Sequence, residues 1–281
     1  MESLRFTKMH GAGNDYIYIN GIADCPANLS KLAVKMSDRH KGVGSDGLIV
    51  ILPSAVADFK MRMFNSDGTE GEMCGNASRC IGKYVYEKGL TNKKVISLET
   101  LSGIKMLSLN IDSGYVTSVS VDMDQPVLQP EKIPVSSERE ILNHAVETSL
   151  GLLRITAVST GNPHGVVFVD NVDDMDICVA GRELERHPLF PRKANIEFVE
   201  VLNPGELKMR IWERGSGETQ ACGTGACAAV VAGVLTGRCS RDITVHSPGG
   251  TLHIKWEEHN NHLYMSGESA FVFEGEYLIE P

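Results

Sequence analysis

An internal repeat constrains the fold of this chain more than any other feature of its sequence. Residues 61–65 (MRMFN) align with residues 209–213 (MRIWE) at an offset of 148 residues, and the same offset places Cys74 on Cys222. Two copies of one sequence pattern imply two structurally similar halves. The other matched positions are Gly13-Asn14 with Gly161-Asn162, Glu70 with Glu218, Gly75 with Gly223 and, after a slip of one residue, Ser102-Gly103 with Gly249-Gly250.

The segment of residues 122–151 connects the two halves. It carries Pro126, Pro130 and Pro134, and proline is frequent in connections because it cannot donate a backbone hydrogen bond. A chain of 281 residues is long enough for two domains, each with its own core. We therefore expect an N-terminal half over residues 1–121 and a C-terminal half that begins at residue 122.

Most segments of each half have the pattern of strands, and two have the pattern of helices. Residues 223–235 (GTGACAAVVAGVL) are apolar on every side, which predicts a helix enclosed by other elements. The matching residues 75–89 end on Gly89, a residue type common at helix C-terminal caps. The pattern predicts an α+β fold, with two similar strand-rich halves around central helices. The predicted strands are residues 17–19, 47–52, 59–64, 94–98 and 105–109, and then 154–158, 166–169, 195–201, 207–213, 243–246 and 252–256.

Composition limits the classes of partner. The chain has 27 basic and 36 acidic residues, a net charge near −9, and the basic residues form no stripe. This pattern disfavours nucleic acid and anionic membranes as partners. No apolar run reaches the length of a membrane span, and the N-terminal residues lack a signal-peptide pattern. We expect a cytoplasmic protein that acts on a small molecule, and the seven cysteines are then free thiols rather than disulfides.

Cys74 and Cys222 each precede the start of a predicted helix. Unpaired amides and the positive end of the helix dipole favour a thiolate there, and the same amides can bind a carboxylate. If the two halves face each other, one sulfur lies on each face of a bound α-carbon. One thiolate can then remove the α-proton while the other thiol delivers a proton to the opposite face. The pair therefore predicts an epimerase or racemase that needs no cofactor and no metal.

Other readings of the cysteines are weaker. The spacing of Cys74 with Cys80 and of Cys222 with Cys227 is wider than in structural zinc sites, and a C-x-x-C redox motif is absent. Residues 223–225 (GTG) resemble the start of a dinucleotide-binding fingerprint, but its third glycine position is Ala228. A reversible disulfide between Cys74 and Cys222, in a redox sensor or binding protein, stays an alternative. The remaining cysteines, which we expect to be packing residues, are Cys25, Cys80, Cys178, Cys227 and Cys239.

Polar residues at turns and strand ends are candidates for substrate binding. Asn is common in turns for structural reasons, so each of Asn14, Asn65, Asn162 and Asn195 has a structural alternative. The repeat makes the surroundings of the two cysteines different. It places Asn65 on Glu213, which can pair with an ammonium, and Arg214 can bind a carboxylate with two hydrogen bonds. His164 is either a structural loop residue or a helper that tunes the proton of a nearby thiol, and we expect the second. The candidate site residues are Asn14, Asn65, Cys74, Gly75, Asn76, Asn162, His164, Asn195, Glu213, Arg214, Cys222, Gly223 and Thr224.

Taken together, these motifs resemble the diaminopimelate epimerase family. The segments that carry the resemblance are residues 10–15 (HGAGND), 64–68 (FNSDG), 72–76 (EMCGN), 161–164 (GNPH), 213–215 (ERG) and 221–225 (ACGTG). The resemblance implies an epimerase, independent of pyridoxal phosphate, that interconverts LL- and meso-diaminopimelate for lysine and peptidoglycan synthesis. It also implies two strand barrels, each around a central helix, with the active site in the cleft between them. The last strand, about residues 271–279, would return to the first domain, which gives domains of 1–121 plus about 270–281 and of 122–269.

The resemblance also implies a role for each candidate. Cys74 and Cys222 are the two bases, and Glu213 lies by the reacting ammonium. The amides of Gly75-Asn76 and Gly223-Thr224 bind the carboxylate at the reacting centre. The residues implied to bind the distal amino-acid end are Asn65, Asn162, Asn195 and Arg214, with Asn14 lining the site.

The sequence departs from the family pattern at two positions. Gly47 stands where some members have a substrate-contacting Gln, and Ala77 stands where Gly is commoner. The related proline racemases carry His at the position of Asn76, so a proline racemase-like enzyme is the second choice. The sequence leaves the oligomeric state open, with a homodimer as one option.

Overall fold

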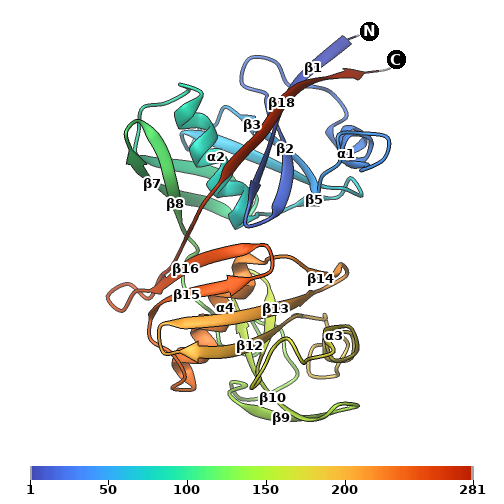
Figure 1. Cartoon of the computed structure of the whole chain (residues 1–281), viewed down its shortest axis with the longest axis vertical. Helices are drawn as coiled ribbons and strands as arrows, with labels where there is room; N and C mark the ends of the chain where they lie inside the picture. Colours follow the sequence, from blue (N-terminus) through green and yellow to red (C-terminus); the bar gives the residue numbers. More distant parts are fainter. Residues whose placement is uncertain (1, 280–281) are drawn as a thin grey trace. The chain divides into compact units, whose positions relative to one another are not determined.

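The computed structural model describes residues 2–279 and divides into two compact units. The first runs to Val121 and includes the chain from Gly267 onward, and the second is Asp122–Ser266. Met1 and residues 280–281, which the predicted first domain includes, lie outside the described residues. Both units contain strands and helices (Figure 1).

The first unit is a curved sheet with two helices. Its strands pair in the order β18-β1-β2-β3-β4-β6-β7-β8, and the β2–β3 and β4–β6 pairings are parallel. Helix α2 contacts β1 and β2 as well as the distant β7, so the sheet wraps around it. The elements are β1 (Glu2–Gly11), β2 (Asn14–Asn20), α1 (Leu29–Ser37), β3 (Gly47–Leu52), β4 (Phe59–Asn65), β5 (Glu70–Gly71), α2 (Gly75–Glu87), β6 (Val95–Thr100), β7 (Gly103–Asp112), β8 (Tyr115–Asp122) and β18 (Ala270–Ile279).

The second unit repeats this topology. Its strands pair in the order β9-β10-β11-β12-β13-β15-β16-β17. The β11–β12 and β13–β15 pairings are parallel, and they correspond to the parallel β2–β3 and β4–β6 pairings of the first unit. Helix α4 contacts β10, β11, β12 and β16. The elements are β9 (His144–Thr148), β10 (Gly151–Ser159), β11 (Pro163–Phe168), α3 (Ile177–Glu185), β12 (Asn195–Asn203), β13 (Glu206–Glu213), β14 (Gly217–Thr219), α4 (Gly223–Leu235), β15 (Asp242–Ser247), β16 (Gly250–Trp256) and β17 (Leu263–Gly267).

The central helices form where the sequence predicts them. In α4 every residue from Gly225 to Gly233 is buried, as expected for a segment that is apolar on all sides. Helix α2 ends at Glu87, and Gly89 follows with a φ of 70°, a left-handed conformation that suits glycine. Both helices start directly after a cysteine, 148 residues apart.

Two helices were not predicted from the sequence. Helix α1 packs on β3 and β4, and α3 packs on the matching strands β12 and β13. Each has only nine residues and one apolar face, which gives a weak periodic signal. Asp176 caps α3 by accepting a hydrogen bond from Val179 N. The connecting segment also contains a strand, β9, that the proline pattern did not predict.

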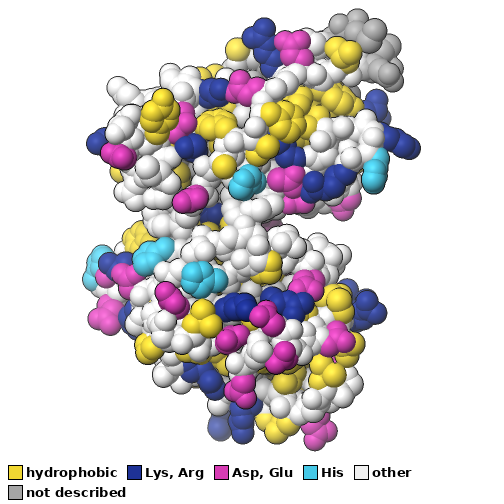
Figure 2. Space-filling model, in the orientation of Figure 1, with side chains coloured by type: hydrophobic (Ala, Val, Ile, Leu, Met, Phe, Trp, Pro, Cys, Tyr) yellow, Lys and Arg dark blue, Asp and Glu magenta, His cyan; other side chains and the backbone are white. Residues whose placement is uncertain are grey.

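Strand β18 lies against β1 in the first unit, although the paired residues His10 and Ala270 are 260 positions apart in the chain (270 − 10). The side chains of Val272, Phe273 and Leu278 are exposed. Figure 2 shows apolar side chains gathered on the first unit where Figure 1 places this strand. Within residues 2–279, the helices are too short to cross a membrane.

Candidate active site

The first group of candidate residues, called the first half-site below, contains Asn14, Cys74, Gly75 and Asn76 and surrounds the start of helix α2. Cys74 is extended, with φ −137° and ψ 118°, and its carbonyl accepts the first helical hydrogen bond from Ser78 N at 2.9 Å. The amides of residues 75–77 therefore precede the hydrogen-bond ladder of the helix. Such amides can bind an anion beside the Cys74 sulfur, because the helix dipole is positive at this end.

Asn14 connects the cysteine to the rest of the first half-site. Its Oδ1 accepts from Cys74 Sγ at 3.3 Å and from Asn76 Nδ2 at 3.5 Å. Its Nδ2 donates to Asp46 Oδ2 at 2.8 Å. Because the ionised Asp46 carboxylate can only accept, this contact fixes the Asn14 amide with its oxygen toward the thiol.

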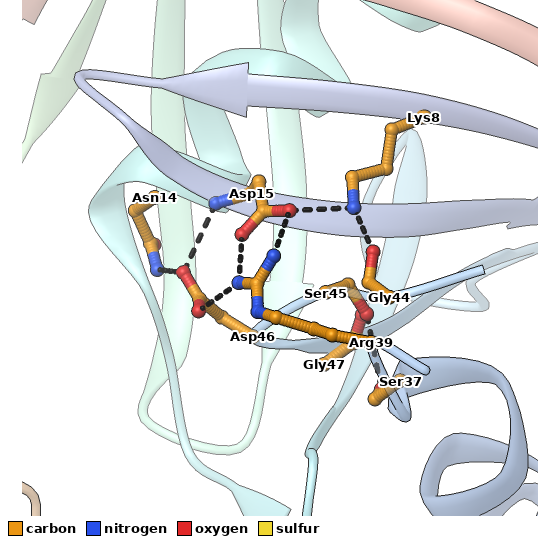
Figure 3. A network of polar contacts seen from close by, with 9 residues as sticks. All are labelled: Lys8, Asn14, Asp15, Ser37, Arg39, Gly44, Ser45, Asp46 and Gly47. Carbon is orange, nitrogen blue, oxygen red and sulfur yellow. Dashed lines mark hydrogen bonds and ion pairs between the residues drawn. The ribbon is translucent and has the colours of Figure 1, made fainter. Parts of the chain in front are cut away.

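A network of charged residues holds Asp46 in place (Figure 3). Arg39 contacts Asp46 Oδ1 at 2.9 Å and Asp15 Oδ1 at 2.7 Å, while Lys8 pairs with Asp15 Oδ2. Burial, and then the charge of Asp15, raise the pKa of Asp46. Burial also acts to raise the pKa of Asp15, but hydrogen bonds from Arg39 and Lys8 outweigh it and lower that pKa. None of these four residues was a predicted site residue.

Asn65 lies at the end of β4, opposite Gly47 on β3. Its Nδ2 donates to Thr69 Oγ1 at 2.9 Å, so its side chain supports the turn that follows. A Cβ at Gly47 would lie 2.1 Å from Phe64 O and 2.8 Å from Tyr16 Cε1. In this backbone only glycine fits at position 47.

The second half-site surrounds the start of helix α4. Cys222 has φ −133° and ψ 115°, and Ala226 N donates to its carbonyl at 2.9 Å. The amides of residues 223–225 therefore also precede the helical hydrogen bonds and can bind an anion. The Cys222 side chain is buried, and its Sγ lies 3.3 Å from Thr224 Oγ1.

The proton on Cys222 is held more tightly than the helix start alone predicts. Burial, followed by the charges of Glu213 and Glu197, raises the pKa of Cys222 well above its ordinary value. At Cys222, desolvation and two nearby carboxylates therefore oppose the thiolate that a helix start favours. Burial also raises the pKa of Glu213, which accepts a hydrogen bond from Thr219 Oγ1 at 2.5 Å.

His164 lies in a buried chain of polar contacts. Its Nδ1 is 2.6 Å from Glu197 Oε1 and its Nε2 is 2.7 Å from Asn162 Oδ1. Its contacts within the second unit are therefore to these two residues rather than to a thiol. Glu197 was not predicted as a site residue, although the repeat places it on Ile49, and a carboxylate in place of a core isoleucine is a usable signal.

Asn195 and Arg214 form a third group in the second half-site. Asn195 lies opposite His164 on the neighbouring parallel strand. Its Oδ1 accepts from Arg214 N at 2.8 Å, which leaves its Nδ2 as a donor. The exposed Arg214 side chain donates to Arg192 O at 3.1 Å.

The structure thus brings the candidates together in two sets, each within one unit. The first contains Asn14, Cys74, Gly75 and Asn76, with Asn65 in a nearby turn; the second contains Asn162, His164, Asn195, Glu213, Arg214, Cys222, Gly223 and Thr224. Each set joins a thiol, a helix start and amide side chains. This combination suits proton transfer at the α-carbon of a carboxylate-bearing substrate.

Known proteins match this chain along nearly its whole length. Residues 6–129 and 156–272 match the diaminopimelate epimerase family. The chain belongs to this family. A diaminopimelate epimerase of Acetivibrio thermocellus is 57% identical over 274 residues, which cover 97% of this chain and 98% of that one. One of Desulfovibrio desulfuricans is 52% identical over 284 residues and covers 99% of both chains.

Solved structures share the fold at much lower identity. A PhzF-family phenazine biosynthesis protein of Bacillus anthracis has a TM-score of 0.73 at 18% identity and covers 99% of this chain and 100% of its own. A hydroxyproline epimerase of Agrobacterium vitis has a TM-score of 0.69 at 16% identity, with 99% and 91% covered. The predicted fold class, α+β with two similar strand-rich halves, is confirmed.

Proposed function

We propose that this chain is a cofactor-independent epimerase that interconverts LL- and meso-diaminopimelate, with Cys74 and Cys222 as the two acid–base residues. The observation that carries the proposal is the pair of repeat-related helix starts, each with a cysteine and amides that precede the first helical hydrogen bond. Membership of the diaminopimelate epimerase family supports the choice of substrate. The product would serve lysine and peptidoglycan synthesis.

The reaction needs both sulfurs at one α-carbon, one on each face. One thiolate takes the α-proton, and the electron pair left on the carbon spreads into the substrate carboxylate. The opposite thiol then donates its proton to the other face, so that one proton leaves and one arrives. The amides at the two helix starts, at Gly75-Asn76 and Gly223-Thr224, would stabilise the negative charge on the carboxylate. The raised pKa of Cys222 suits a proton donor. In the direction in which Cys222 donates its proton, Cys74 would be the base.

The residues around Cys222 would recognise the substrate. Glu213, beside Cys222, would pair with the ammonium at the reacting centre. The charge of His164 acts to lower the pKa of Glu213, so His164 would tune this carboxyl. Asn195 and Arg214 offer donors for the distal carboxylate.

The remaining candidates complete the proposed site. Asn162 would bind the same distal end as Asn195 and Arg214, and Asn65 would do so from the first unit. Asn14 would line the pocket at Cys74. This arrangement differs between the two halves, as required for a substrate that reacts at one end and is recognised at the other.

The direct test is to incubate the protein with LL-diaminopimelate in deuterated water under reducing conditions. We expect the meso isomer to form with deuterium at its α-carbon. Proton NMR would measure this as loss of the α-proton signal. Cys74→Ala and Cys222→Ala should each lower the rate by at least about 10²- to 10⁴-fold, because each removes one of two proton carriers. An active single variant would refute the two-base mechanism, and no exchange by the wild type would refute the epimerase.

The same assay separates the alternatives. A proline racemase-like enzyme would exchange the α-proton of L-proline and leave diaminopimelate unchanged. A redox sensor would catalyse neither reaction, and it would show a Cys74–Cys222 disulfide that forms and breaks with the redox potential.

We also propose that the protein is a cytoplasmic homodimer. The exposed apolar side chains of β18 support a second copy as the occupant of that surface. Sedimentation of the wild type and of Phe273→Glu would test this. A wild-type monomer, or an unchanged dimer in the variant, would contradict the use of this surface.

A further inference from the structure

Glu197, on strand β12, is a buried carboxylate beside the candidate catalytic residues. Its Oε1 lies 2.6 Å from His164 Nδ1, and both side chains are 0% exposed. Among residues 2–279, Glu197 Oε2 has no hydrogen-bond partner. Burial of a carboxyl group and an imidazole, with one carboxyl oxygen unsatisfied, costs free energy, so the stability of the fold does not account for this pair.

The first unit forms the same strands without such a pair. At the offset of 148, Tyr16 corresponds to His164 and Ile49 corresponds to Glu197. Strands β2 and β3 nevertheless pair in the same parallel register as β11 and β12. The fold of a unit therefore does not need the pair.

Helix α4 also makes room for this carboxylate. A Cβ at Gly225 would lie 2.7 Å from Glu197 Oε1. The corresponding residue of α2 is Ala77, and the residue that corresponds to Glu197 is Ile49, which has no carboxylate. The second unit thus differs from the first at three linked positions, His164, Glu197 and Gly225.

The pair ends at a residue that a ligand can reach. Asn162 is partly exposed, and its Oδ1 lies 2.7 Å from His164 Nε2. A carboxylate and an amide oxygen both only accept, so a ring that bonds to both carries a proton on each nitrogen. With a neutral ring the proton can lie on either nitrogen, so Nε2 can accept instead and the amide is free to turn. The charge of Glu197, which keeps a proton on both ring nitrogens, therefore fixes which atom of Asn162 is left for a ligand.

We propose that Glu197 is a positioning residue that acts through His164 to keep Asn162 Nδ2 available as a donor for the distal carboxylate of the substrate. This proposal rests on the proposed function. Asn195 has its oxygen bonded to Arg214 N, so its Nδ2 is also left as a donor. With the Arg214 guanidinium these groups supply donors only, which suits a carboxylate and disfavours an ammonium at that end.

The first test measures the ring of His164 without reference to activity. Nitrogen-15 NMR of histidine-labelled protein should show both ring nitrogens of His164 protonated, with the signals assigned from His164→Gln. Glu197→Gln should convert the ring to the neutral form. Glu200→Gln, on the same strand, should leave it unchanged, and Glu197→Asp, which keeps the charge, should stay close to wild type. A doubly protonated ring in Glu197→Gln would overturn the proposal.

The second test uses the epimerase assay. Glu197→Gln should raise KM for diaminopimelate by about 10- to 100-fold, as expected when a hydrogen bond to a charged group is lost, with a much smaller change in kcat. Adding Glu197→Gln to Asn162→Ala should have little further effect, because both act on one contact. Additive effects, or a fall in kcat at constant KM, would overturn the proposal. An inactive wild type would refute the epimerase function, whereas the NMR result would still test the charge of His164.

Discussion

Replacement of Gly225 by alanine tests how tightly helix α4 is fitted to the second half-site. In an ordinary helix this change stabilises a protein by about 1 kcal/mol. Here the new methyl would lie 2.7 Å from Glu197 Oε1, 2.9 Å from Ile211 Cδ1 and 3.3 Å from Cys222 Cβ. Overpacking of a buried site costs about 1–3 kcal/mol, and loss of a hydrogen bond to a charged group, here that of Glu197 with His164, costs about 1.5–3 kcal/mol. The low ends of the two costs add to about 2.5 kcal/mol, and the helical gain offsets part of this sum. We therefore expect a net loss of stability of roughly 2 kcal/mol.

Tryptophan fluorescence in urea can measure this change in the second unit alone. The chain has two tryptophans, Trp212 and Trp256, and both lie in that unit. The reciprocal variant Ala77→Gly is the control, because it changes the first unit and should leave the tryptophan transition in place. Gly225→Ala should also lower epimerase activity, since the methyl crowds Cys222. A gain of stability of about 1 kcal/mol would refute the reasoning, because it is the ordinary helical effect.

Alkylation of Cys222 should be slow near neutral pH and should accelerate only above its ordinary thiol pKa of 9.0, because burial and then Glu213 raise that pKa. Glu213→Gln should move the profile to lower pH, measured by mass spectrometry; a move to higher pH would contradict the assignment. Asp46→Asn should lower kcat/KM by about tenfold, because it weakens the hydrogen bond that holds the amide of Asn14. An unchanged kcat/KM would show that the network of Figure 3 does not act on Asn14. Cys239, whose burial raises its pKa to about 11, should stay unmodified at pH 8 in the native protein; rapid labelling there would contradict its burial.

The repeat determined the architecture from sequence alone. Because each copy carries the same pattern, the two units have the same order of strand pairing, and α2 and α4 start 148 residues apart. The two helix starts were found because a Cys-Gly step precedes a buried helical segment. Helices α1 and α3 were missed because a nine-residue amphipathic helix owes its stability to the strands it packs on rather than to its own sequence.

The tertiary structure decided the protonation and the partners of the site residues. A helix start favours a thiolate, yet burial, followed by the charges of Glu213 on β13 and Glu197 on β12, raises the pKa of Cys222. The contacts of Asn14 with Asp46 and of His164 with Glu197 join residues more than 30 positions apart. Local pattern specifies elements and the residue types at their ends. Desolvation and the field of neighbouring charges depend on what else packs there, which only the folded chain determines.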